Sequence, residues 1–262
     1  MAKIQNDKYY TSPELAKYCV EKTKEIIGED NITEYIEPSA GLGVFLDYLD
    51  KPYLAYDIEP EDNRIEKADW LSVDLDYKKG RCVIGNPPFG NRNTLSVQFY
   101  KKSIELCDYI AFILPISQFN NNQQMYEFDL IYSEDLGKRE YSDRVVHCCF
   151  NIYKRPKYQL NCKPDYKLND IDITEVRLNN KIVDKYDFKI IAWGAGVGRL
   201  LSDEEHYAKE FYWTVKREEL KDKVCKTLQS VDWIKQYAMT ATPNLLQWQV
   251  YKYLKEQIPE LE

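Results

Sequence analysis

Residues 82–89 read CVIGNPPF and join an uninterrupted apolar run to a turn that contains two prolines. A continuous apolar run, rather than an alternating one, indicates a parallel strand buried on both faces. Similar runs occupy 34–36, 53–57 and 109–115, and a stretch with helical spacing, 94–107, lies between two of them. Strands that alternate with helices in this way predict an α/β fold with a doubly wound sheet.

The elements that flank this core have their own boundary signals. Ser12 and Pro13 form an N-cap and first-turn pair, so we expect a helix over 13–27. The segment 37–45 is followed by a second expected helix, and residues 145–153 predict one or two strands that close the sheet with an antiparallel edge.

The pattern changes near residue 160, where Pro156 and Pro164 bracket a basic linker. We therefore expect a first domain over 1–158 and a small C-terminal α+β lobe over 159–262.

Three local patterns describe the expected lobe. The runs 173–178 and 181–193 flank Asn179-Asn180 and predict a hairpin. Ser202 with Glu205 predicts a capping box, and Thr242 with Pro243 predicts the start of a last helix.

The composition excludes several classes of protein. With 262 residues and 44% hydrophobic content, the chain can bury a large core, which excludes a disulfide-stapled mini-protein. Seven cysteines without a repeated spacing predict reduced thiols. The longest apolar run, 109–116, is too short to cross a membrane, and residues 1–10 lack a signal-peptide pattern. We expect a soluble, cytoplasmic protein with no membrane partner.

The charge is unevenly distributed. A formal net charge of -7 disfavours tight binding to nucleic acid, because phosphate binding depends on Lys and Arg. Between residues 138 and 167, however, eight Lys or Arg stand against three acids. This basic run is either a solvated face or a segment that approaches phosphates, and both interpretations stay open.

The segment 37–45, EPSAGLGVF, follows the first predicted strand. Two glycines at such a turn let the backbone approach a ligand at the carboxyl edge of the sheet, although a tight packing turn is the alternative. Asp57 ends the second strand, where a carboxylate can accept hydrogen bonds from ribose hydroxyls. Asp69 and Trp70 offer a carboxylate and a ring to an adenine, or else are a surface acid and a core ring.

The turn Asn86-Pro87-Pro88-Phe89 carries the most specific chemistry. Two successive prolines donate no backbone hydrogens and fix the turn, which presents the Asn86 amide and the Pro87 carbonyl as acceptors. An exocyclic amino group has the two hydrogens that such a pair accepts. Accepting both draws the nitrogen lone pair out of ring conjugation and makes the nitrogen more nucleophilic, while Phe89 can stack on the base.

Taken in order, these motifs resemble those of the S-adenosylmethionine-dependent adenine-N6 DNA methyltransferases of the gamma motif order. The resemblance covers about residues 8–156 and includes Thr11-Ser12-Pro13 at the front of the chain. Its specific part is the Asn-Pro-Pro-Phe signature, and the glycine segment is less specific. It implies a Rossmann-like class I methyltransferase sheet and S-adenosylmethionine as the cofactor.

The resemblance also implies roles for individual residues. It assigns cofactor binding to Thr11, Glu37, Pro38, Ala40, Gly41, Gly43, Asp57, Ile58, Asp69 and Trp70. It assigns contacts with the target amine or base to Asn86, Pro87, Pro88 and Phe89.

Further substrate contacts are expected from the later part of the chain. Family members often carry a second aromatic residue on a late strand, and Phe150 is the candidate here, with a buried strand phenylalanine as the alternative. Lys154 and Arg155 follow it and are expected to approach phosphates. Arg199, in the glycine cluster 193–199, is a candidate for DNA contact, unless the cluster is only a tight turn.

The expected reaction is a direct, in-line methyl transfer to an adenine that is flipped out of the DNA stack. It needs no metal, and the two histidines, His147 and His206, lack zinc-site spacing. RNA adenine and the side-chain amide of glutamine are alternative acceptors, and a non-catalytic binding subunit is a further alternative. The C-terminal lobe is small for target recognition, so DNA specificity is expected to be short or relaxed, or to depend on an additional subunit, as in restriction-modification.

Overall fold

The computed structural model describes residues 10–141, 144–178, 185–239 and 242–262. The chain divides into two compact units, Met1–Pro164 and Asp165–Glu262. The division falls between Pro164 and Asp165, six residues after the expected boundary at 158.

The first unit is built on a seven-stranded sheet in the order β3-β2-β1-β4-β5-β7-β6. Its strands are β1 (Glu34–Glu37), β2 (Tyr53–Asp57), β3 (Glu66–Lys67), β4 (Arg81–Gly85), β5 (Tyr109–Pro115), β6 (Asp129–Tyr141) and β7 (Arg144–Lys154). Strands β1 to β5 are parallel, and β7 is antiparallel to both of its neighbours, β5 and β6. This arrangement confirms the predicted α/β fold with a Rossmann-like sheet and an antiparallel strand near one edge.

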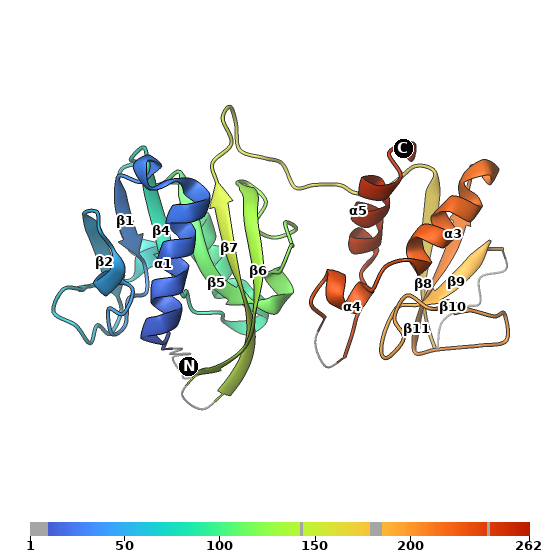
Figure 1. Ribbon diagram of the computed structural model, residues 1–262, viewed down its shortest axis with the longest axis horizontal. Helices are drawn as coiled ribbons and strands as arrows, with labels where there is room; N and C mark the ends of the chain where they lie inside the picture. Colours follow the sequence, from blue (N-terminus) through green and yellow to red (C-terminus); the bar gives the residue numbers. More distant parts are fainter. Residues whose placement is uncertain (1–9, 142–143, 179–184, 240–241) are drawn as a thin grey trace. The chain divides into compact units, whose positions relative to one another are not determined.

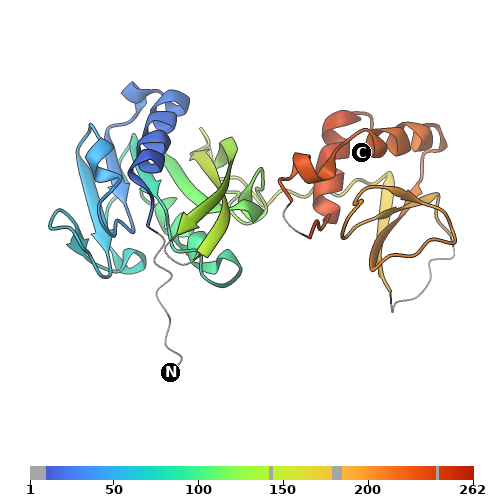
Figure 2. The ribbon, with the colours of Figure 1, turned by 60° about the horizontal axis from the view of Figure 1, so that its bottom comes forward.

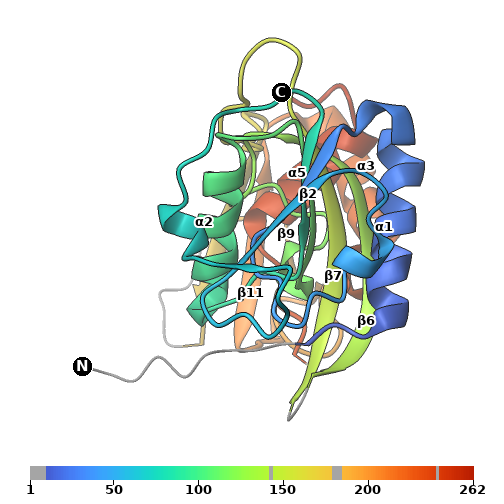
Figure 3. The same cartoon turned by 90° about the vertical axis from the view of Figure 1, so that its left-hand side faces the viewer.

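Helices cover both faces of this sheet (Figure 3). The helix α1 (Pro13–Ile27) matches its predicted bounds, and its first turn is capped by a hydrogen bond of 3.3 Å from Leu15 N to Ser12 Oγ. The helix α2 (Thr94–Ser103) covers the other face and ends four residues before the predicted limit. Short 3-10 turns complete the unit at Glu29–Asn31, Leu46–Tyr48, Trp70–Ser72, Asn91–Asn93 and Ile116–Gln118.

Two predictions for the first unit need correction. The segment after 37–45 forms only the 3-10 turn Leu46–Tyr48 and no α-helix, because β2 starts at Tyr53 and the short connection 46–52 leaves no room for one. Strand β6 was not predicted, since its charged residues do not form a continuous apolar run.

The second unit contains a four-stranded sheet in the order β10-β9-β11-β8 (Figure 2). Its strands are β8 (Ile171–Arg177), β9 (Phe188–Ile191), β10 (Leu200–Leu201) and β11 (Lys209–Val215). The turn Glu218–Leu220 leads into α3 (Lys221–Gln229), which is followed by α4 (Trp233–Gln236) and α5 (Gln247–Gln257). Buried side chains of α3, α5 and β11 share one apolar cluster, so helices and sheet form the α+β lobe that was predicted.

Two local predictions for this unit are wrong, and a third holds in part. Strands β8 and β9 are not a hairpin, because β11 lies between them and is antiparallel to both; the expected turn, Asn179-Asn180, lies outside the described residues. Glu205 accepts a hydrogen bond of 2.9 Å from Ser202 N, as in a capping box, yet a turn rather than a helix follows. Helix α5 starts at Gln247 because Pro243 O is engaged by Gly194 N at 2.8 Å in an extended segment.

The glycine cluster of the second unit is a packed turn. Gly198 has a φ of 89°, and a Cβ atom there would lie 2.1 Å from Cδ1 of the buried Trp233. Gly198 therefore allows close approach to Trp233, which agrees with the tight-turn interpretation.

Candidate active site

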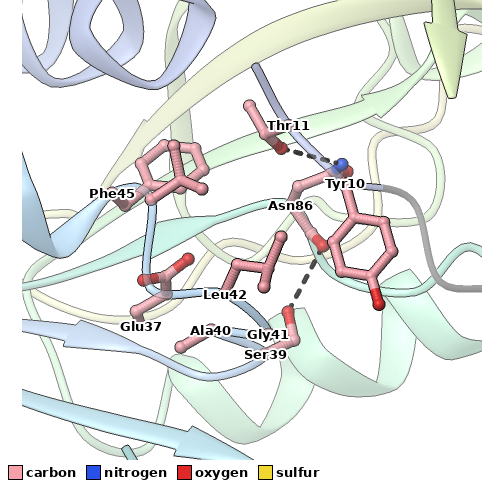
Figure 4. Close-up of a pocket in the computed structure, with 10 residues that line it drawn as sticks. Tyr10, Thr11, Glu37, Ser39, Ala40, Gly41, Leu42, Phe45 and Asn86 are labelled. Carbon is pink, nitrogen blue, oxygen red and sulfur yellow. Dashed lines mark hydrogen bonds between the residues drawn. The ribbon is translucent and has the colours of Figure 1, made fainter. Parts of the chain in front are cut away.

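A pocket lies where the chain leaves strands β1 and β4, which are neighbours in the sheet although β2 and β3 come between them in sequence. Chains diverge at such a switch point and leave a crevice at the carboxyl edge of a parallel sheet. The pocket encloses about 310 Å³, counted out to its open mouth. Its lining comes from Tyr10, Thr11, Glu37, Ser39, Ala40, Gly41, Leu42, Val44, Phe45 and Asn86 (Figure 4).

Asn86 is held by two segments that are distant from it in sequence. Its Nδ2 atom donates a hydrogen bond of 3.2 Å to Thr11 Oγ1, and its backbone carbonyl accepts one of 3.3 Å from Ser39 Oγ (Figure 4). Because the side-chain amide is planar, donation to Thr11 turns Oδ1 to the opposite side. The structure thus joins the front segment, the glycine segment and the proline turn.

Two hydrogen bonds from helix α2 hold the proline turn. Pro88 O accepts a hydrogen bond of 3.2 Å from Ser96 Oγ, and Phe89 O accepts one of 3.3 Å from Leu95 N, so α2 holds the turn. Gly90 has a φ of 66°, and a Cβ there would lie 2.8 Å from Leu95 Cγ.

The glycine segment is bound to strand β2. Ala40 N donates to Tyr56 O at 2.9 Å, and Gly41 N donates to Asp57 Oδ2 at 2.8 Å. Asp57 Oδ1 accepts a further bond of 2.8 Å from Glu59 N. Each carboxylate oxygen keeps a second lone pair, so Asp57 can still accept from a ligand hydroxyl at this edge.

Glu37 is a buried carboxyl group at the wall of the pocket. Its side chain is 2% exposed, and its Oε2 atom has no hydrogen-bond partner among the described residues. Burial, and then the charge of Asp57, raise the pKa of Glu37 well above its ordinary value, while Arg64 partly opposes them. A cationic group of a ligand would supply the partner that this oxygen lacks.

The two residues predicted to contact adenine, Asp69 and Trp70, lie in different surroundings. Ala68 N donates to Asp57 O at 2.9 Å, so Asp69 lies close to the end of β2, where Ile58 is 50% exposed. Asp69 accepts hydrogen bonds from Leu71 N at 3.0 Å and Ser72 Oγ at 3.4 Å. Trp70, in contrast, is 1% exposed and packs against Tyr56 in the core, so the prediction that its ring stacks on adenine is wrong.

Phe89 and Phe150 are also core residues in this structure. Phe89 is 6% exposed and Phe150 is 0% exposed, and both belong to the apolar cluster that includes Leu15 of α1. Neither ring presents an open face, so the expectation that they stack on a base is wrong for this conformation; for Phe150, the buried alternative holds.

The basic residues after Phe150 are far from the pocket. Lys154 pairs with Tyr109, the first residue of β5, and so lies at the amino edge of the sheet. Arg155 donates to the carbonyls of Cys107 and Ile104 and forms an ion pair of 3.4 Å with Asp108. Strand β7 runs from one edge of the sheet to the other, so the basic run is spread over both edges and does not form one face. The predicted phosphate contacts of Lys154 and Arg155 at this site are therefore wrong.

Arg199 is placed in the second unit, where its guanidinium is already engaged. It forms an ion pair of 3.0 Å with Glu205 and a hydrogen bond of 2.7 Å to Tyr207 OH. The described residues contain no helix with the length and apolarity needed to cross a membrane, and no group of three His, Cys, Asp or Glu placed to bind a metal ion.

Several pocket residues were not predicted as site residues. Tyr10 donates a hydrogen bond of 2.5 Å to Glu61 and lies beside Thr11, while Ser39, Leu42, Val44 and Phe45 belong to the segment 37–45. Their adjacency to the motifs was the available signal, but which side chains turn inward depends on the tertiary structure.

Comparison with known proteins finds similarity in structure only. No family model and no curated protein sequence matches the chain. A proposed RNA methyltransferase from Pyrococcus horikoshii has a TM-score of 0.47 and 16% identity, over 59% of this chain and 90% of that one. The methyltransferase subunit of a type I restriction-modification system from Streptococcus thermophilus has a TM-score of 0.45 and 15% identity, over 58% of this chain and 47% of that one.

A third solved structure, the 23S rRNA methyltransferase ErmE, has a TM-score of 0.42 and 13% identity, over 59% of this chain and 72% of that one. At these identities the likenesses are distant, so the residues of this chain must carry any assignment of function.

Proposed function

We propose that this protein transfers a methyl group from S-adenosylmethionine to N6 of adenine in DNA. The observation that carries the proposal is the meeting of Asn86, on a double-proline turn after β4, with Thr11 and the glycine segment in one pocket at the switch point of the sheet. When bound, S-adenosylmethionine supplies a methyl group activated on a sulfonium.

The pocket residues fit this cofactor. The buried Oε2 atom of Glu37, which has no hydrogen-bond partner among the described residues, suits the ammonium group of its methionine part. The backbone at Gly41 permits close approach, and Asp57 with the exposed Ile58 can bind a ribose and an adjoining ring. These features are the basis for assigning Glu37, Pro38, Ala40, Gly41, Gly43, Asp57, Ile58, Asp69 and Thr11 to cofactor binding.

The chain's own contribution to the reaction is orientation. The amide oxygen of Asn86 lies buried on the side away from Thr11, and Pro87, having no N–H, leaves its carbonyl as the second acceptor. Together they accept the two hydrogens of a planar amine and expose its lone pair. Because both acceptors are fixed before the substrate arrives, they do not have to be ordered during the reaction step, which lowers its entropic barrier.

The test is methyl transfer from tritiated S-adenosylmethionine to duplex DNA, single-stranded DNA, RNA and protein, followed by mass spectrometry of the released nucleosides. We expect N6-methyldeoxyadenosine. If the label appears in RNA adenine or in glutamine side chains, that group is the acceptor and DNA adenine is not. If the protein binds the cofactor but transfers no label, the result would support a non-catalytic subunit.

Asn86→Ala should remove transfer while cofactor affinity stays near that of the wild type. Asn91→Ala is the matched control, because Asn91 is exposed and does not line the pocket. Full activity of Asn86→Ala would refute the assignment of the amine-binding residue. Recognition of the DNA sequence by residues 165–262, by Arg199 or by an additional subunit stays a prediction.

A further inference from the structure

Two arginines of the described chain stand apart from all others by lacking an ion pair. The remaining arginines with described side chains each contact an acid: Arg64, Arg81, Arg155, Arg177, Arg199 and Arg217. Among the described residues, Arg92 and Arg139 have no such partner, although the chain carries a net charge of -7. In a chain with an excess of acids, an arginine that stays unpaired invites a functional explanation.

Arg92 is held next to the proline turn in an unfavourable backbone conformation. It lies three residues after Phe89, is exposed, and has a φ of 51°, and Asn93 has a φ of 64°. Such backbone strain is unfavourable for non-glycine residues and persists only where the surroundings enforce it.

Two hydrogen bonds enforce the conformation of this loop. Asn93 Nδ2 donates to Ser117 Oγ at 2.7 Å, and Thr94 Oγ1 donates to Asn91 O at 2.9 Å. They tie the loop to the end of β5 on one side and to the start of α2 on the other. The loop that carries the exposed Arg92 is therefore held in place at the carboxyl edge of β4.

Arg139 reaches the same edge from the opposite face of the sheet. It pairs with Val146 on β7, beyond Cys148, which is opposite the last residue of β5. Strands β6 and β7 therefore continue past the carboxyl edge (Figures 1 and 3). Val146 packs on the α1 side, and the charge of Arg139 acts on Cys19 of α1, partly opposing the burial that raises the pKa of that thiol.

The side chain of Arg139 is incompletely satisfied. It is half-buried, and its Nε atom is buried without a hydrogen-bond partner among the described residues. Leaving a buried donor unpaired is energetically costly, and more so when the group is charged. An anionic ligand at the carboxyl edge would remove that cost.

We infer that Arg92 and Arg139 bind backbone phosphates of the nucleic-acid strand on either side of the target nucleotide. This inference rests on the proposed function and adds the residues that hold the polyanion. Arg92 precedes α2 on one side of the sheet and Arg139 lies on the α1 side, and the Asn86 turn follows β4, which β5 and β7 separate from β6 in the sheet order. A strand that crosses the edge to present a base to Asn86 would run from one guanidinium toward the other.

The test compares the binding of a short single-stranded oligodeoxynucleotide to the full-length wild type, Arg92→Gln, Arg139→Gln and the double variant over a range of salt concentrations. Losing one phosphate contact should reduce the slope of log K against log salt by about 0.7. We expect this loss in each single variant, the sum of both losses in the double variant, and several-fold weaker binding at moderate salt. Arg139→Lys should restore most of the slope because it keeps the charge.

Lys154→Gln is the control, since it removes an exposed positive charge at the amino edge. Affinity for S-adenosylmethionine should be equal in all variants, which shows that they are folded. The inference would be overturned if both single variants kept the wild-type slope of log K against log salt, or if Lys154→Gln reduced that slope as much as they do. Neither result would count against methyl transfer. Absence of transfer by the wild type, in contrast, would count against the proposed function itself.

Discussion

At the scale of single residues, the site depends on polar groups whose partners come from distant parts of the chain. Asn86 is oriented by Thr11, and Glu37 is a buried carboxyl group with one unpartnered oxygen among the described residues. The hydrogen bond to Thr11 fixes the orientation of Asn86, while the buried Glu37 oxygen without a described partner destabilises the folded state. Both effects can be measured.

Thr11→Val should lower kcat about fivefold with little change in KM for the acceptor. The hydrogen bond from Asn86 Nδ2 to Thr11 Oγ1 fixes which side of the amide faces the substrate, and its loss is worth about 1 kcal/mol. Steady-state kinetics check this, with Thr11→Ser as the variant expected to retain activity. Unchanged kcat in Thr11→Val would show that Thr11 does not position Asn86.

Glu37→Gln should stabilise the fold and weaken cofactor binding. The pKa of Glu37 is raised in the folded state, so the folded protein binds this proton more tightly than the unfolded chain, and stability falls as pH rises above the unfolded value of about 4.3. The glutamine variant lacks this loss, so urea denaturation should show a gain on the order of 1 kcal/mol at pH 7.5.

At pH 3 the same comparison should show little gain, because the carboxyl group is then largely protonated in both states. Calorimetry at pH 7.5 should show weaker binding of S-adenosylmethionine, since the variant cannot become an anion. Stabilisation without any loss of affinity would indicate that Glu37 does not contact the cofactor.

At the scale of elements, the two turns at the carboxyl edge matter more than the strands that carry them. The segment after β1 passes through Gly41 and Gly43 at positive φ, and the turn after β4 is stiffened by Pro87 and Pro88. Strands supply the platform, and these connections decide where the backbone and Asn86 meet.

Gly43→Ala should destabilise the protein by about 1–2 kcal/mol or more, because a left-handed conformation disfavours a Cβ atom. In addition, that Cβ would lie 3.2 Å from Arg64 Nη2 and Asp62 Oδ2 and 3.3 Å from Leu46 Cδ1. Gly137→Ala is the matched control, with a φ of 75° and no atom within 4 Å of the new Cβ. Thermal denaturation should rank Gly43→Ala below Gly137→Ala, and the reverse order would contradict the packing argument.

Trp70→Phe should lower stability but change cofactor affinity less than threefold. The indole is buried against Tyr56 and donates a hydrogen bond of 3.5 Å to Phe99 O, so its place is in the core on the α2 side. Removing most of a buried aromatic side chain, as in Trp70→Ala, costs about 3–5 kcal/mol. If Trp70→Phe is stable but binds the cofactor much more weakly, the Trp70 ring contacts the cofactor after all, contrary to its buried position in the structure.

At the scale of the whole molecule, the division after Pro164 assigns every pocket residue to the first unit. Its sheet and both flanking helices are complete without residues 165–262. Each unit also has its own apolar core, as expected of segments that fold independently.

A chain that ends at Pro164 should therefore unfold cooperatively and bind S-adenosylmethionine with an affinity similar to that of the full chain. Circular dichroism and calorimetry test this. Loss of folding would show that the second unit completes the core of the first. Retained folding with lost methyl transfer would place substrate recognition in residues 165–262.

Much of this organisation follows from local sequence. The uninterrupted apolar runs predicted β1, β2, β4 and β5, because a strand buried on both faces has no polar side. Ser12 and Pro13 fixed the start of α1, since capping is a contact between residues three apart. The proline turn identified Asn86 because its chemistry lies within four consecutive residues.

Other features depended on contacts between distant residues. Whether an aromatic ring stacks on a ligand or fills the core is decided by the elements packed around it, and Trp70, Phe89 and Phe150 are all enclosed. The basic run is continuous in sequence, yet β7 carries its parts to opposite edges of the sheet. Sequence by itself determined which chemical groups are present and the order of the strands along the chain. Only the tertiary structure decided which groups meet, because burial and distance are set by packing between elements.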